Sequence, residues 1–143
     1  MPVSHEIDAE RRLVIARGHG VLTYDDIVAY QTEVWSRPEV VGFDEIVDNS
    51  DVERIAYRSP RYVAELAELG ANMDSERETL LAIVSPDYGS YGLARMYQTY
   101  RGLQSKGKKK VALFRSFEEA SQWIASERRL ASRSQSGTEK PVR

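Results

Sequence analysis

The chain has 143 residues, a formal net charge of −2 and no cysteine. This length suits one domain with a single core, and the near-zero charge argues against a general nucleic-acid binder. The missing thiols exclude disulfides, thiolate metal sites and cysteine nucleophiles. No apolar run approaches the roughly 20 residues needed to cross a bilayer, so we expect no stable membrane insertion. The first ten residues lack the order of a signal peptide, so we expect a cytoplasmic protein.

The first part of the chain predicts a hairpin followed by a helix. Residues 3–7 and 13–16 are short strand-like runs, and the residues between them are polar turn formers. Thr23 and Asp26 are spaced as a capping box, which predicts that a helix begins there. Pro38 ends this helix, because proline cannot continue it.

Three strand–helix units follow. Strands are predicted over 42–47, 79–84 and 110–114, and the helices after them open at Ser59–Pro60, Ser85–Pro86 and Ser116. Little apolar material remains after these units. We therefore expect a domain over residues 1–130 and a disordered polar tail over residues 131–143.

The order of these elements predicts the fold class. Strands that alternate with helices imply right-handed crossovers and an α/β protein. We predict a single open, five-stranded, mostly parallel sheet flanked by helices, in the order ββαβαβαβα. The first strand is expected to pair antiparallel with the second, at an edge of the sheet.

Several stretches resemble the STAS domain of bacterial anti-sigma-factor antagonists and its relatives. The second strand and the start of the first helix of that family resemble LVIARGHGVLTYDDI, and its third strand resembles FDEIVDNSDVERI. Its last two strand–helix units resemble AIVSPDYGSYGLARMYQTYR and VALFRSFEEASQWI. The resemblance implies a non-catalytic regulatory or protein-interaction module in a bacterial cytoplasm. The related CRAL-TRIO lipid-binding domains share this winding. They imply an alternative, which is a carrier of a small apolar or lipid-like ligand between helices and sheet.

The third predicted strand ends in a stretch that resembles the family's Asp-x-Ser-Gly-Val pattern. Asp48, Ser50 and Val52 match it, while Asp51 stands where glycine is usual. Ligands of open α/β sheets bind at the carboxyl ends of strands, so Asp48 and Ser50 are candidates for a partner or ligand surface. The same residue types form turns, so a simple turn at a strand end is the competing interpretation.

The start of the second predicted helix carries the second candidate. Classical antagonists have an Asp-Ser-Ser-Gly motif here, and one of its serines is phosphorylated. In this chain residues 56–60 keep only Ser59 as a hydroxyl, and Pro60 follows it. Ser59 is therefore interpreted as a helix cap, with phosphorylation as the alternative.

The third predicted helix start adds Asp87, Tyr88 and Tyr91 to the candidate surface. Both tyrosines fall off the buried stripe of the helix. Tyrosine is favoured at protein interfaces, so we expect either a partner surface here or a plain packing role.

The remaining residues point to no chemistry. His5 and His19 have no second ligand at metal-ligand spacing, and no nucleophile is evident beside them. We therefore expect no metal, no cofactor and no catalytic residue. Lys106–Lys110 is expected to be a solvated basic loop.

The expected partners follow from these candidates. We expect a protein partner, a small apolar ligand as the alternative, and no nucleic acid. A homodimer stays open if Trp35, Tyr57 and Trp123 leave an exposed apolar patch.

Overall fold

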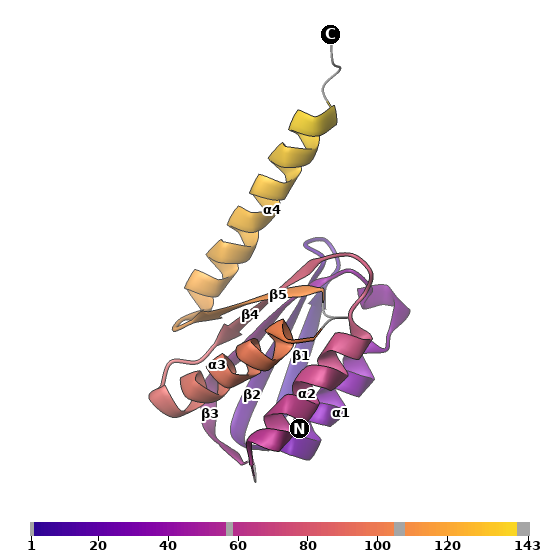
Figure 1. Ribbon diagram of the computed structural model, residues 1–143. Coiled ribbons are helices and arrows are strands. Elements are labelled where there is room, and N and C mark those ends of the chain that lie inside the picture. Colours follow the sequence, from indigo (N-terminus) through magenta and orange to yellow (C-terminus); the bar gives the residue numbers. More distant parts are fainter. Residues whose placement is uncertain (1, 57–58, 105–107, 140–143) are drawn as a thin grey trace.

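The computed structural model describes residues 2–56, 59–104 and 108–139, and it contains one five-stranded sheet (Figure 1). The strands are β1 (Val3–Asp8), β2 (Leu13–Thr23), β3 (Asp44–Ala56), β4 (Thr79–Val84) and β5 (Lys109–Phe114). They lie side by side in chain order, with β1 antiparallel to β2 and all other neighbours parallel. The predicted α/β class and the antiparallel edge strand are confirmed.

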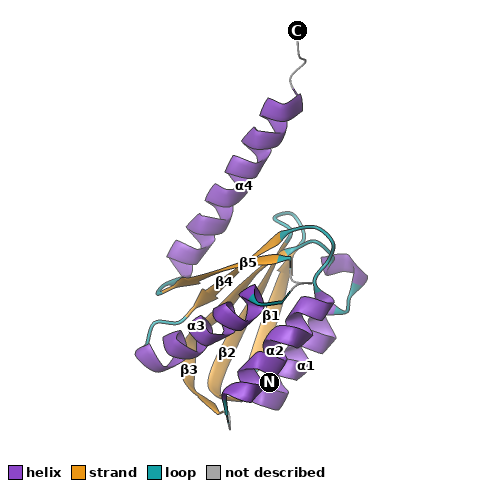
Figure 2. Ribbon diagram, viewed as in Figure 1, coloured by secondary structure: helices purple, strands orange, loops and turns teal. Residues whose placement is uncertain are grey.

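Helices cover both faces of the sheet (Figure 2). They are α1 (Tyr24–Trp35), α2 (Pro60–Met73), α3 (Tyr88–Gly102) and α4 (Phe117–Glu139), with a short 3-10 turn η1 (Pro38–Val40) after α1. Alternate residues of a strand point to opposite faces. Val14 therefore packs with α1, whereas its neighbours Leu13 and Ile15 pack with α4. The helices α1, α2 and α3 share one face, and α4 has the other (Figure 1).

Local capping chemistry sets where the helices begin. The hydroxyl of Thr23 accepts from the Asp26 backbone N–H at 3.1 Å, and the Asp26 carboxylate accepts from Thr23 N–H at 2.9 Å. The predicted capping box is thus confirmed. The prediction that Ser85 opens the third helix is wrong. Asp87 caps α3 by accepting from the Ser90 N–H at 2.8 Å, while Ser85 is fully buried.

Strand β3 is much longer than predicted. It was expected to end at residue 47, but it runs to Ala56 because β2 extends beside it, from Arg17 opposite Asp48 to Thr23 opposite Ala56. Strand β4 pairs with β3 only as far as Asp48. Residues 47–52 (VDNSDV) are therefore part of a strand with a β-bulge between Asp48 and Asp51, and the interpretation of them as a turn at a strand end is wrong.

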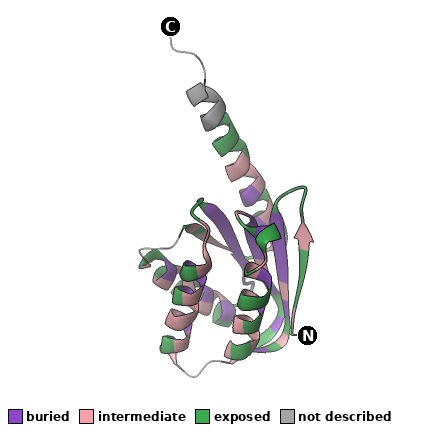
Figure 3. Ribbon diagram, turned by 90° about the vertical axis from the view of Figure 1, so that its right-hand side faces the viewer, coloured by how far each residue is buried: buried purple, intermediate pink, exposed green. Residues whose placement is uncertain are grey.

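Helix α4 leaves the body of the molecule (Figure 3). Ala120 and Ile124, near its start, are buried in the core, whereas Leu130 is 55% exposed. The helix continues to Glu139 through part of the stretch that was expected to be a disordered tail. The domain boundary at residue 130 stays a prediction, and residues 140–143 lie outside the described residues.

The charged residues of the core are paired. Asp74 receives two hydrogen bonds from the Arg101 guanidinium, at 2.7 and 2.8 Å. Burial alone would lower the pKa of Arg101, but the hydrogen bonds and charge of Asp74 outweigh it, so this pKa is raised. Asp44 is bound in the same way by Arg128 on α4.

The predicted basic loop does not hold together as one solvated cluster. The Lys109 side chain is only 5% exposed and donates to Glu45 at 3.1 Å, and Lys110 donates to Glu127 at 2.6 Å. Lys108 is exposed, and Lys106 lies outside the described residues. The prediction is therefore wrong for Lys109, because this lysine neutralises a buried carboxylate.

The predicted tryptophan patch is also corrected. Trp35 lies under the Lys109 ammonium, 3.7 Å from the ring centroid, and Trp123 packs on Phe114 with ring centroids 5.4 Å apart. Both tryptophans are partly buried against the core. Tyr57 lies outside the described residues. The patch that suggested a homodimer is therefore not formed by the tryptophans, and the homodimer stays a prediction.

Candidate functional site: a cavity between helices and sheet

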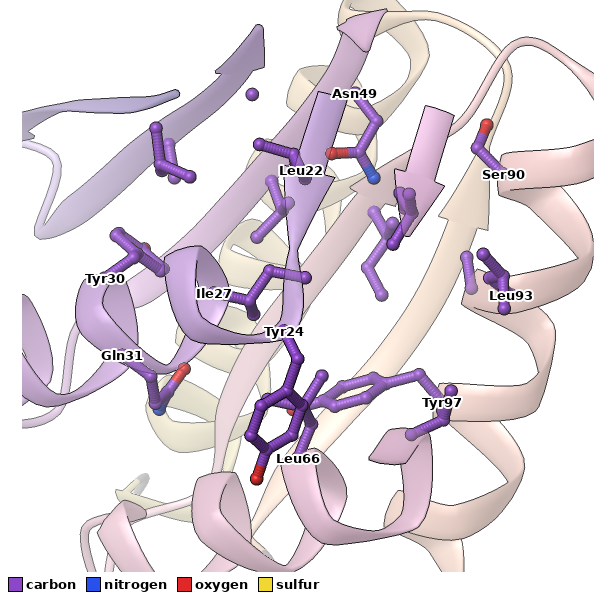
Figure 4. A pocket seen from close by; sticks show the side chains of 18 of the residues that line it. Leu22, Tyr24, Ile27, Tyr30, Gln31, Asn49, Leu66, Ser90, Leu93 and Tyr97 are labelled. Atoms are coloured by element: carbon purple, nitrogen blue, oxygen red, sulfur yellow. The ribbon is translucent and has the colours of Figure 1, made fainter. Parts of the chain in front are cut away.

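A cavity of about 150 Å³ lies between the sheet and helices α1, α2 and α3 (Figure 4). Its walls are mostly apolar side chains, with Ala16, Leu22, Val47 and Ile83 on the sheet and Ile27, Val63, Leu66 and Leu93 on the helices. An apolar cavity of about this size is able to hold a benzene-sized molecule. The space is about half of what a drug-sized ligand usually occupies.

Small residues on both walls keep this space open. Ala16 and Gly18 lie on β2, and Ala94 lies opposite on α3. At Gly18 an added Cβ would come within 2.7 Å of Val52 and 2.9 Å of Leu22, so only glycine lets these two side chains approach. The local sequence therefore shapes the cavity from the sheet side.

A buried hydrogen-bond network closes the cavity around Glu45. The Tyr30 hydroxyl donates to this carboxylate at 2.6 Å, Trp35 Nε1 donates at 3.1 Å, and Lys109 supplies the countercharge. Burial raises the pKa of Tyr30 well above its ordinary value, and the negative charge of Glu45 adds to the effect. The charge of Glu45 is therefore already paired with Lys109, and its carboxylate is hydrogen-bonded. The role of Glu45 here is structural.

Tyr97 is held in a similar way. Its hydroxyl accepts a hydrogen bond from Arg101 Nε at 3.1 Å, and Arg101 in turn holds Asp74. Burial raises the pKa of Tyr97, although the positive charge of Arg101 opposes this. The phenol stays neutral at physiological pH and acts as a cavity wall.

Sequence reasoning missed Asn49, which is 6% exposed and lines the cavity. Its side-chain Nδ2 lies 3.5 Å from the Ser85 hydroxyl. Asn49 points toward the helices with the other lining residues, whereas Asp48 and Ser50 do not line the cavity. A β-bulge lies here, because the three steps of β3 from Asp48 to Asp51 face the two steps of β2 from Arg17 to His19. The alternation of a regular strand was therefore not a usable signal for the direction of Asn49.

The predicted candidates Asp48 and Ser50 are hydrogen-bonded to each other. One carboxylate oxygen of Asp48 accepts from the Ser50 N–H at 3.0 Å and from the Ser50 hydroxyl at 2.5 Å. Ser59 occupies the N-cap position of α2, but its side chain makes no capping hydrogen bond. The structure therefore places Ser59 where predicted without the capping bond that was expected of it.

Asp87, Tyr88 and Tyr91 gather at the start of α3. Tyr88 is 86% exposed, and the Arg115 guanidinium lies 5.3 Å from its ring centroid and 4.5 Å from that of Tyr91. The pKa of Asp87 is lowered, because its carboxylate accepts from the backbone N–H and the hydroxyl of Ser90. We call Tyr88, Tyr91 and Arg115 the tyrosine–arginine surface. Among the described residues, no hydrogen bond or ion pair joins it to Asp48, Ser50 or Ser59.

A serine does lie beside His19, contrary to the expectation from sequence. Ser4 Oγ is 3.1 Å from His19 Nε2, and Asp51 is on the other side of the ring at 3.9 Å. The order resembles a nucleophile, base and acid, but 3.9 Å exceeds hydrogen-bond distance. His19 and Asp51 are 45% and 75% exposed in their side chains, so water reaches the whole group. The arrangement lacks the buried, oriented acid of a catalytic triad.

Metal clusters and membrane-spanning helices are both absent from the part of the chain that the structure describes. No three His, Asp or Glu side chains gather there as a metal site would require. None of the helices there combines the length and apolar character needed to cross a membrane.

The sheet order and the helix placement define an α/β domain with the SpoIIAA-like, or STAS-like, fold. A solved structure that shares it is an uncharacterized protein of the DUF3478 family from Shewanella loihica PV-4. The TM-score is 0.56 and the sequence identity 11%, over 85% of this chain and 93% of that one. This identity supports the fold alone. The chain matches no protein-family model and no curated protein sequence.

Proposed function

We propose that this protein is a non-catalytic regulatory module that binds a small apolar molecule in the cavity beneath α1, α2 and α3. The apolar cavity itself is the observation that carries the proposal. It supports the small-ligand alternative that the CRAL-TRIO resemblance implied. Its volume of about 150 Å³ favours a compact molecule the size of one ring over a lipid with long chains.

The apolar lining supports an apolar ligand. Ligand sites are concave and are lined mostly by hydrophobic and aromatic side chains, with a few polar groups among them. A bound apolar molecule would gain dispersion contacts with these walls.

Native mass spectrometry of the full chain, purified from its host, tests this proposal. We expect a co-purified small mass that is released when the protein is denatured. Ala94→Leu should abolish it, because the larger side chain fills the cavity from α3. Ala29→Leu is the matched control, because Ala29 is exposed on α1. A clean apo spectrum, together with no binding of benzene or toluene to the purified protein, would contradict the proposal.

We propose the tyrosine–arginine surface as a second candidate, which is a protein-binding site. The exposure of Tyr88, stacked beside Arg115, favours it. Tyrosine and arginine are enriched among the residues that dominate binding energy. Ser59 stays a candidate for phosphorylation, because its hydroxyl is not engaged in capping α2.

Alanine at Tyr88 tests the second candidate. A photo-cross-linker at position 88 would first identify the partner, and affinity would then be measured with that purified partner. We expect Tyr88→Ala to weaken binding at least tenfold, on the order of a hot-spot residue, without lowering the melting temperature. Leu103→Ala is the control, because Leu103 is 74% exposed at the opposite end of α3. Equal affinity for the two variants would remove this surface from consideration.

A further inference from the structure

The hydroxyl groups around the cavity are largely committed to other parts of the protein. Tyr24 donates to Glu65, Tyr30 to Glu45 and Ser90 to Asp87, and Tyr97 accepts from Arg101. The Glu45 carboxylate is neutralised by Lys109. The hydroxyl protons of Tyr24, Tyr30 and Ser90 are therefore already donated within the protein. No unpaired charge of Glu45 remains to attract an ionic ligand.

Asn49 is different. Its side-chain nitrogen faces Ser85, and among the described residues no group donates to its carbonyl oxygen, Oδ1. A Cβ on Gly18, another residue that lines the cavity, would lie 3.4 Å from Oδ1, so this oxygen points toward the β2 wall of the cavity. Asn49 is 6% exposed and lines the cavity, and Figure 4 shows its amide among the apolar side chains near Leu22. The geometry therefore directs Oδ1 toward the cavity.

A buried carbonyl without a donor is costly. Leaving such a group unsatisfied weakens binding roughly tenfold. A bound apolar ring without a donor would cover Oδ1 and impose this cost. A ring with a hydroxyl or N–H group would donate a hydrogen bond to Oδ1. The polar group of this ligand would then stay hydrogen-bonded when the ligand moves from water into the cavity.

We infer that the cavity selects a compact, neutral ring that carries one hydrogen-bond donor, and that this donor is bound by Asn49 Oδ1. This inference rests on the proposed ligand-binding function and names the chemical class of its ligand. The apolar walls hold the ring, and Asn49 fixes its orientation.

Phenol and toluene form a matched pair for the test, because they differ only in a hydroxyl in place of a methyl group. Their dissociation constants would be measured by calorimetry with the full-length protein and with Asn49→Leu, which keeps a similar side-chain size. We expect Asn49→Leu to weaken phenol binding about tenfold and to leave toluene binding equal or tighter. Asn72→Leu is the control, because Asn72 is exposed on α2 and does not line the cavity, and it should leave the phenol-to-toluene ratio unchanged.

The outcomes distinguish recognition by Asn49 from the ligand-binding function of the cavity. Binding of toluene by Asn49→Leu shows that this variant folds and keeps its cavity. If both probes bind the natural protein and Asn49→Leu does not change their ratio, Asn49 recognition is overturned while the cavity proposal stands. If neither probe binds the natural protein, the ligand-binding function fails and this inference fails with it.

Discussion

Two glycines have opposite surroundings, and their replacement by alanine should have opposite effects. At Gly18 a Cβ would lie within 3 Å of Val52 and Leu22, whereas at Gly92 it would meet nothing within 4 Å. We expect Gly18→Ala to destabilise the protein by about 1–3 kcal/mol through overpacking. Gly92→Ala should stabilise it by about 0.5–1 kcal/mol, because alanine favours the helical backbone of α3. Urea unfolding of both variants checks the signs, and a stable Gly18→Ala protein would show that the β2–β3 contact is loose.

The buried pair of Arg101 and Asp74 allows a second prediction for a single residue. Their side chains are 3% and 2% exposed, so Arg101→Met leaves a buried carboxylate without its cation. The expected loss is about 3–5 kcal/mol. Arg61→Met is the control, because Arg61 pairs with Glu65 on the surface of α2, and we expect it to cost less than about 1 kcal/mol. Similar unfolding midpoints for the two variants would contradict the buried pairing.

At the scale of one element, the start of α3 should respond to pH. The pKa of Asp87 is lowered from 3.8 by its hydrogen bonds to Ser90, so the ionised carboxylate stabilises the folded state. This contribution is present above the ordinary pKa and is lost as pH falls through the lowered one. The stability difference between the natural protein and Asp87→Ala should therefore be constant near neutral pH and shrink below about pH 4. A difference that grows on acidification would refute the capping role.

The elements show why sequence reasoning succeeded for some features and failed for others. The Thr23 capping box is local chemistry, and the apolar run over 79–84 reflects burial on both faces, so both were readable. The length of β3 was not readable, because its second half is a strand only through pairing with β2. Pairing partners distant in sequence leave little local signal.

The cavity belongs to the whole molecule and was the least predictable feature. Its walls come from the strands β1 to β4 and from three helices, so its volume depends on how these elements are placed. Asn49 was visible as a polar residue in VDNSDV, but its direction depended on the face of a strand that was not foreseen. The flanking Asp48 and Ser50 were chosen instead, but they hydrogen-bond to each other and do not line the cavity.

The long helix α4 gives a prediction for the whole chain. Its buried residues are Ala120 and Ile124, near the start, and residues 129–133 are exposed. Removing residues 131–143 should therefore shift the melting temperature by less than about 2 °C, because no described core contact is lost. Ile124→Ala in the full-length chain should cost about 2–5 kcal/mol, because it opens a cavity against the sheet. Thermal unfolding of the two proteins decides the point. A large drop in melting temperature on truncation would move the domain boundary beyond residue 130. It would mean that the second half of α4 makes stabilising contacts with the rest of the protein.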